Sequence, residues 1–206
     1  MDTLWVDVDT LVVPIYAHAH DQTVREGQMT NRIDLSELIP KLEEKLGIDK
    51  GFLESLFDED SDWALIIKVH ALIEAAISDL LVTVFGKEAL NDTFSYLELS
   101  NKKTGKMAFV SALNLLDDNC RRYISSLSEL RNKLVHNVKN VNFQFHEYVE
   151  DMDKQQFNQF VKNFNVLSSK KDDSLLNLFR HDPIQAVWYG AMSVLGQVYL
   201  KIEKHL

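Results

Sequence analysis

The sequence predicts a mainly α-helical fold: an up-and-down helical bundle with a small β-containing extension at its N-terminus. Three observations support this prediction. Only 7 of the 206 residues are glycine and 3 are proline, so few residues interrupt helices. Hydrophobic residues make up 46% of the chain, which is enough to build a core. From residue 62 onward apolar residues recur mostly at helical spacing, whereas residues 4–16 are rich in β-branched residues that partly alternate with aspartates.

The N-terminal extension is expected over residues 1–57. Residues 4–16 predict one or two short strands. A helix follows and is terminated by Gly47, because glycine is common just after a helix end. A short helical turn is expected at residues 52–57.

The helical bundle is expected over residues 58–206. It begins with an acidic cluster at residues 58–62, where carboxylates favour the N-terminus of a helix. The run over residues 62–85 is apolar on nearly every side, as in a central bundle helix, and Gly86 can close it. Three charged residues inside this run argue against a membrane span.

The remaining helices are expected over residues 87–99, 107–116, 119–136, 153–164 and 183–204. Asn137 can take the left-handed position that closes the third of these. Residues 141–145 alternate apolar and polar side chains and predict a short strand or an extended loop.

The net charge of −9 should repel nucleic acids and acidic membranes at long range. The charge is uneven, because residues 100–140 hold eight basic and three acidic residues, a net charge of +5, while the rest of the chain carries −14. This segment indicates either a site for an anionic ligand or a solvated pair of helices with a chance imbalance.

The single cysteine, Cys120, excludes an internal disulfide framework and a cysteine-based zinc finger. The first residues contain no basic stretch followed by a long apolar run, so we expect no signal peptide. Both features are typical of a cytoplasmic protein.

The most informative helix is the one over residues 120–136. On a helical wheel of about 100° per residue, Arg131 lies about 40° from Leu127 and falls on the apolar stripe. An arginine among core positions needs a partner, because an unpaired buried charge is costly. His136 lies five residues later, so its direction differs from that of Arg131 by about 140° on an ideal helix. The two side chains converge only if the helix end unwinds, Arg131 curls round, or a second copy of the chain contributes.

The segment from Leu130 to Asn137, Leu-Arg-Asn-Lys-Leu-Val-His-Asn, resembles the signature of the HEPN superfamily. That signature is an arginine, usually a polar residue, three variable residues and a histidine, near the end of a late helix in a small helical bundle. The resemblance covers residues 62–164, about half of the chain. The apolar run over residues 63–86 is also similar to the mannitol-repressor branch of the superfamily.

The resemblance implies a homodimer in which two copies of the motif line a shared cleft. Many HEPN proteins are metal-independent endoribonucleases of toxin–antitoxin or antiphage systems, so RNA would be the substrate and no cofactor or metal would be needed. An antitoxin or another regulatory protein would be a further partner. The alternative is a non-catalytic dimeric regulator or adaptor that resembles mannitol repressor.

The residue types of the motif suit RNA cleavage, because RNA supplies its own nucleophile, the 2′-hydroxyl. His136 is the candidate acid or base, since histidine titrates near neutral pH. Arg131 would stabilise charge on the phosphate, and Asn132 would hold the phosphate or orient His136. Each residue also has a structural alternative. His136 would be a cation at a helix C-terminus, Arg131 would be part of an ion pair, and Asn132 would be a polar surface residue. The candidate RNA-binding residues are the nearby basic ones, Arg121, Arg122, Lys133 and Lys139.

His70 and Glu74 lie four residues apart on the long apolar helix and therefore share a face. They either support the cleft of Arg131 and His136 from behind or form a local polar pair in the packing. His18 and His20 lack a third ligand nearby, so no metal site is predicted.

Overall fold

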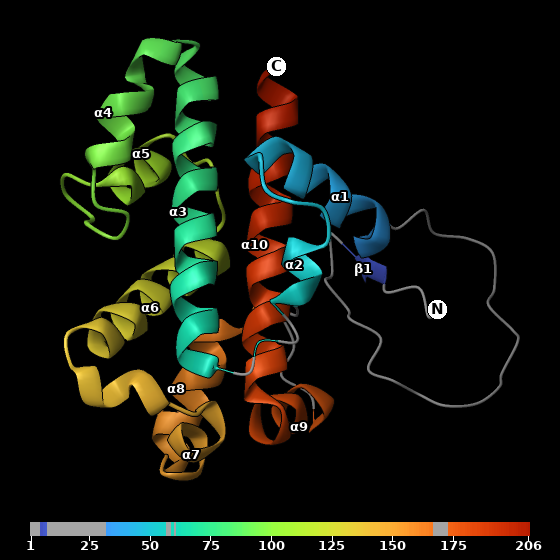
Figure 1. Cartoon of the computed structure of the whole chain (residues 1–206), viewed down its shortest axis with the longest axis vertical. Coiled ribbons are helices and arrows are strands. Elements are labelled where there is room, and N and C mark those ends of the chain that lie inside the picture. Colours follow the sequence, from blue (N-terminus) through green and yellow to red (C-terminus); the bar gives the residue numbers. More distant parts are fainter. Residues whose placement is uncertain (1–4, 8–31, 57–58, 60, 167–172) are drawn as a thin grey trace, which may run out of the picture.

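The computed structural model describes residues 5–7, 32–56, 59, 61–166 and 173–206. This part of the chain is mainly helical, as predicted (Figure 1). Its α-helices are α1 (Leu35–Leu46), α2 (Phe52–Ser55), α3 (Asp62–Phe85), α4 (Asn91–Tyr96), α5 (Lys106–Ala112), α6 (Asp118–Val135), α7 (Phe145–Glu150), α8 (Lys154–Phe164), α9 (Asp173–His181) and α10 (Pro183–His205). Two 3₁₀ turns, η1 (Glu88–Leu90) and η2 (Val138–Asn142), complete them.

Helix α3 has the bounds that the apolar run predicts, and local signals set both ends. The Ser61 side chain accepts a hydrogen bond from the backbone N–H of Ala64 at 3.2 Å and caps the first turn. Gly86 closes the helix at φ 61°, a conformation that glycine adopts without steric cost. The helix buries side chains around most of its circumference and so forms the centre of the bundle.

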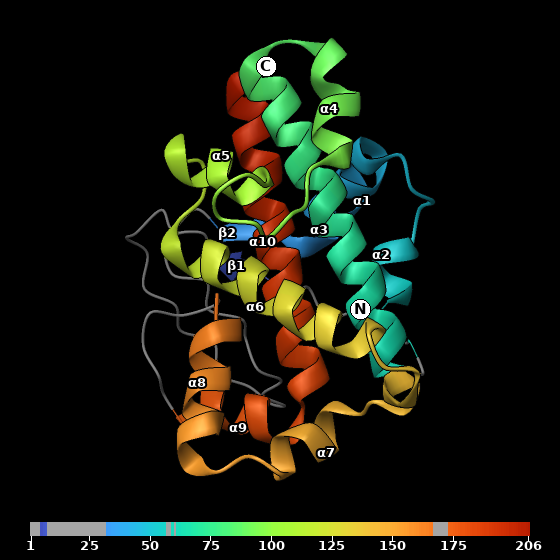
Figure 2. The same cartoon turned by 90° about the vertical axis from the view of Figure 1, so that its left-hand side faces the viewer.

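Helices α3 and α10 lie side by side along most of their length (Figures 1 and 2). Both run from the bottom of Figure 1 to the top, so this central pair is parallel and differs from the simple up-and-down order that the sequence predicts. The pair buries one continuous apolar core. None of the helices in the described ranges combines the length and apolar character that a membrane crossing requires.

Helix α6 crosses the central pair (Figure 2). Because Gly190 of α10 has no side chain, α6 can approach α10 closely at the crossing. A Cβ atom at residue 190 would lie 2.5 Å from Cε2 of Tyr123 in α6. The Tyr123 ring is completely buried there, and its hydroxyl donates a hydrogen bond to the carbonyl oxygen of Val187 at 2.6 Å. Helices α4 and α5 lie toward one end of the bundle and α7, α8 and α9 at the other (Figure 2).

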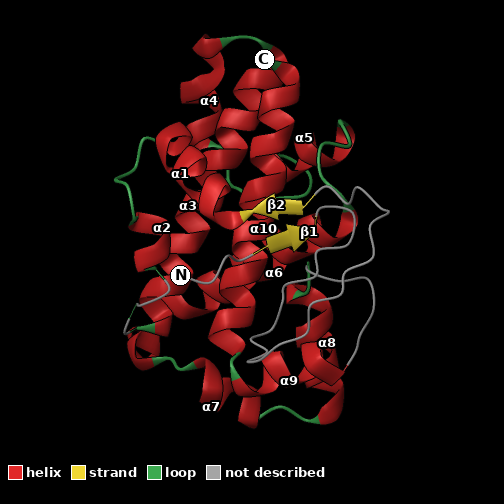
Figure 3. Cartoon of the chain, turned by 90° about the vertical axis from the view of Figure 1, so that its right-hand side faces the viewer, coloured by secondary structure: helices red, strands yellow, loops and turns green. Residues whose placement is uncertain are grey.

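The first described residues form two short strands, β1 (Trp5–Asp7) and β2 (Arg32–Asp34), which pair antiparallel (Figure 3). Most of residues 4–16, on which the predicted β-containing extension rests, lie outside the described residues, so that extension stays a prediction. Helices α1 and α2 also fall before residue 58, and they contribute Ile39, Leu42, Leu53 and Leu56 to the common core. The predicted division of the chain into an extension and a bundle after residue 57 stays a prediction.

One local expectation is met only in part and another is wrong. Residues 141–145 form no strand: Phe143 and Gln144 are a short loop in which Gln144 is extended, but Asn142 ends η2 and Phe145 begins α7, where the N–H of Phe145 donates a hydrogen bond to Asp62 Oδ2 of α3 at 2.6 Å. Asn137 is extended, at φ −139°, instead of left-handed. Its side chain accepts a hydrogen bond from the N–H of Lys139 at 3.0 Å and thus caps η2.

Candidate functional site

The candidate site is built on α6, which is held between α3 and α8. Asp117 caps its N-terminus by accepting a hydrogen bond from the N–H of Cys120 at 2.8 Å. The buried stripe of the helix contains Tyr123, Ile124, Leu127, Leu130 and Leu134. This packing fixes the rotation of α6 and therefore the direction of each motif side chain.

Arg131 is half-buried on the flank of this stripe. Its Nη1 donates a hydrogen bond to Oδ1 of the neighbouring Asn132 at 3.1 Å. No carboxylate of the described residues forms an ion pair with it. A half-buried guanidinium with only a neutral amide as partner retains donors for an anion.

His136 is exposed at the C-terminal end of α6. Its backbone N–H donates to the carbonyl oxygen of Asn132 at 3.2 Å, and its side chain forms no hydrogen bond or ion pair with any described residue. No such contact joins His136 to Arg131 within the described ranges. One copy of the chain therefore holds the motif residues at neighbouring but separate positions.

A buried polar network lies beside Arg131 and joins α3, α5 and α6. His70 Nε2 lies 3.1 Å from Ser128 Oγ, and that hydroxyl donates its proton to the carbonyl oxygen of Ile124 at 2.9 Å. His70 Nε2 must therefore be the donor toward Ser128. The other ring nitrogen, Nδ1, lies 3.9 Å from Glu74 Oε2, and Glu74 Oε1 accepts a hydrogen bond from Lys106 Nζ at 3.0 Å. The candidates His70 and Glu74 thus share one network.

Burial lowers the pKa of His70 below its ordinary value of 6.5, because the interior disfavours the charged ring. The Glu74 carboxylate opposes this shift, whereas the positive charges of Arg131 and Lys106 add to it. His70 is therefore neutral at pH 7. Arg131 follows Ser128 by three residues on α6, so its side chain lies on the same face of the helix as the Ser128–His70 contact.

Ser128, His70 and Glu74 follow one another in the order of a hydrolase triad. Ser128 is only 1% exposed, however, and its hydroxyl proton is engaged by the backbone of its own helix. A substrate cannot reach such a nucleophile, so this arrangement is a structural link between α3 and α6.

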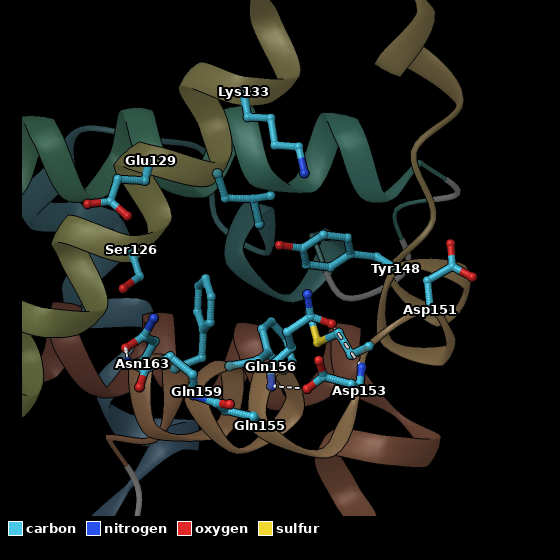
Figure 4. A pocket seen from close by; sticks show the side chains of 14 residues that line it. Ser126, Glu129, Lys133, Tyr148, Asp151, Asp153, Gln155, Gln156, Gln159 and Asn163 are labelled. Atoms are coloured by element: carbon cyan, nitrogen blue, oxygen red, sulfur yellow. Dashed lines mark hydrogen bonds between the residues drawn. The ribbon is translucent and has the colours of Figure 1, made fainter.

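A groove of about 820 Å³ lies on the opposite flank of α6, between that helix and α7 and α8 (Figure 4). Its walls carry Ser126, Glu129 and Lys133 from α6, Tyr148 from α7, and Gln155, Gln159 and Asn163 from α8. The Lys133 ammonium lies 5.1 Å from the centre of the Tyr148 ring. The groove also contains Asp151 and Asp153, so its acidic residues outnumber its basic ones.

Of the predicted RNA-binding residues, Arg121 and Arg122 line a second pocket together, away from Lys133 and Lys139. Arg121 donates to the carbonyl oxygen of Leu116 at 2.7 Å and pairs with Asp118. Arg122 donates from Nε to the carbonyl oxygen of Lys162 at 2.9 Å and so ties α6 to the end of α8. Both arginines therefore stabilise the fold through these contacts. Lys133 faces the groove, and Lys139 is exposed in η2.

Two features of the site had no clear signal in the sequence. Lys106 lies in the basic segment that the charge count identifies, yet its side chain is buried against α3. Three exposed valines, Val135, Val138 and Val141, lie at the end of α6 and in η2; we call them the valine patch.

In the described part of the chain no three histidine, cysteine or acidic side chains come together as metal ligands would.

Comparison with protein-family models, curated proteins and solved structures finds no match to this chain.

Proposed function

We propose that this protein is a metal-independent endoribonuclease of the HEPN type, acting as a toxin or an antiphage defence effector. The observation that supports this most is the state of Arg131. It is half-buried, it has no carboxylate partner among the described residues, and it follows Ser128 by three residues on α6, where Ser128 contacts His70 of the buried network, in a protein whose net charge is −9. An RNA phosphate is the kind of anion that such a guanidinium binds.

The proposed chemistry uses the 2′-hydroxyl of RNA as the nucleophile toward the adjacent phosphate. His136 accepts the proton of the 2′-hydroxyl and returns it to the departing 5′-oxygen, because it is exposed and its ring is not engaged by any described side chain. Arg131 stabilises the negative charge that develops on the phosphate, and Asn132, hydrogen-bonded to Arg131, keeps the guanidinium in place. The products are a 2′,3′-cyclic phosphate and a 5′-hydroxyl.

A homodimer completes the proposed site. His136 and the three valines of the valine patch are exposed in a single copy, and a second copy would cover them. A second copy packed on this patch would bring its own motif close to Arg131. Light scattering should then give about twice the chain mass of 23.7 kDa. A single-chain mass at micromolar concentration would contradict the dimer.

The function is tested by incubating the protein with single-stranded RNA in the presence of EDTA. Cleavage should persist, leave cyclic phosphate ends and fail on DNA of the same sequence. Arg131→Ala should reduce the rate at least about 100-fold, the usual effect of removing a charge-stabilising donor. Loss of cleavage in EDTA would contradict the metal-independent mechanism.

A second candidate function is that of a non-catalytic regulator or adaptor, and the groove beside α6 favours it. The groove combines an apolar floor of Leu130, Phe160 and Phe164 with polar walls that are more acidic than basic. These walls suit a segment of a regulatory protein better than a polyanion. A stable dimer that binds a protein partner and leaves RNA intact would support this function.

A further inference from the structure

Lys106 is buried at the first position of α5, although lysine is among the residues least often found inside proteins. Its side chain is 2% exposed, and its direction is fixed by the turn that precedes it. The N–H of Lys106 donates to the carbonyl oxygen of Glu98 at 3.0 Å. A Cβ atom on Gly105 would lie 2.2 Å from that oxygen, so only glycine allows the turn to close this tightly.

The buried ammonium points at one carboxylate. Lys106 Nζ lies 3.0 Å from Glu74 Oε1, while Glu74 Oε2 faces His70 Nδ1 at 3.9 Å. The Glu74 side chain is one-third exposed, at 33%, so it also reaches solvent. The Glu74 carboxylate therefore lies between the Lys106 ammonium and the His70 ring.

The charges at this contact decide whether it attracts an anion. The charged groups acting on His70 are Glu74 of its own helix, Arg131 of α6 and Lys106 of α5. With His70 neutral, two positive charges face one negative charge. Without Lys106, Glu74 would cancel the charge of Arg131, and the site would lose its net attraction for a phosphate.

We propose that Lys106 is a positioning residue that holds the Glu74 carboxylate and offsets its charge, so that Arg131 can bind an RNA phosphate. This inference rests on the proposed function, since it assumes that Arg131 receives the phosphate. Lys106 does not itself touch the RNA and acts through Glu74.

A pH-dependent signature separates this role from simple structural support. When Lys106 is removed, one of the two positive charges that lower the pKa of His70 is lost, so the pKa of His70 rises. On acidification His70 then takes up a proton and restores the missing positive charge beside Arg131. The loss of RNA affinity should therefore disappear at acidic pH.

The experiment measures the affinity for a short single-stranded RNA with 2′-O-methyl groups, which cannot be cleaved, by fluorescence anisotropy. At about pH 7.5, Lys106→Met should weaken binding about fivefold, the effect of one partly screened charge. Glu74→Gln in the same chain should restore the affinity, and at about pH 5.5 the single variant should bind like the wild type. Lys103→Met is the matched control, because Lys103 is an exposed lysine three residues earlier. Any loss of RNA affinity in Lys103→Met should remain when Glu74→Gln is added and when the pH is lowered.

Titration of the His70 ring by NMR gives an independent readout, in which Lys106→Met raises the pKa of His70 and Glu74→Gln lowers it. Unchanged titration, or no rescue by Glu74→Gln while binding still depends on Arg131, overturns the role of Lys106. Full RNA affinity in Arg131→Ala overturns the proposed function instead, and with it the assumption on which this role rests. If Lys106→Met does not fold, Glu74→Gln alone decides, because it must tighten RNA binding and lower the pKa of His70.

Discussion

Removing Glu74 should destabilise the protein far more than removing its partner Lys106. Glu74→Leu leaves the ammonium of a buried lysine side chain without its carboxylate. Breaking a buried ion pair in this way costs about 3–5 kcal/mol, and we expect about 2–3 kcal/mol here because the carboxylate itself is one-third exposed. Lys106→Met keeps most of the buried apolar stem and leaves a carboxylate that is already one-third exposed to water where it stands. Its cost should be at most about 1 kcal/mol.

Urea unfolding followed by circular dichroism measures this difference. With a slope of about 2 kcal/mol per molar urea, Glu74→Leu should lower the midpoint by about 1 M and Lys106→Met by less than about 0.5 M. The double variant should resemble Lys106→Met, because no buried charge is then unpaired. The control pair is Lys68 and Glu59 on the surface, where Lys68→Met should change stability by less than about 1 kcal/mol. Equal destabilisation by Lys106→Met and Glu74→Leu would refute the reasoning.

Two other predictions concern the core and its pH dependence. Gly190→Ala should destabilise the protein by about 1–3 kcal/mol in urea unfolding, although alanine favours helices, because the new methyl group meets the buried Tyr123 ring; unchanged or increased stability would contradict the close crossing of α6 and α10. Because the pKa of His70 lies below 6.5 in the folded chain, the unfolded chain binds a proton that the folded chain does not, and stability should fall as the pH drops below about 6.5. His70→Gln should flatten this part of the curve of thermal unfolding against pH, and an unchanged slope would show that other groups cause it.

The long helices could be predicted from the sequence because their signals are local. The apolar run over residues 62–85 and the closing Gly86 predict α3 with its observed bounds. Pro183 similarly marks the start of α10. Helix α7 was not predicted because the alternation of apolar and polar residues around Phe145 resembles that of a strand. The start of the helix is secured by a tertiary contact, in which the N–H of Phe145 donates a hydrogen bond to Asp62 of a distant helix.

The candidate site could be predicted only in part for the same reason. Spacing of four residues brings His70 and Glu74 to one face, and the structure places them in one network. Ser128, the other partner of His70, lies 58 residues away, and the burial of Lys106 arises from the packing of α5 on α3. Contacts of this kind depend on the tertiary fold, so no local pattern reveals them.

The role of His136 is the central claim, and one comparison tests it most directly. RNA cleavage in EDTA is measured for the wild type, for His136→Ala and for His146→Ala, which changes another exposed histidine, at the start of α7. Because His136 is exposed at a helix end, its loss should leave folding and dimer mass unchanged. We predict that His136→Ala loses at least about 100-fold in rate while His146→Ala keeps the wild-type rate. Equal cleavage by the wild type and a folded His136→Ala protein would contradict the ribonuclease mechanism and favour the regulator.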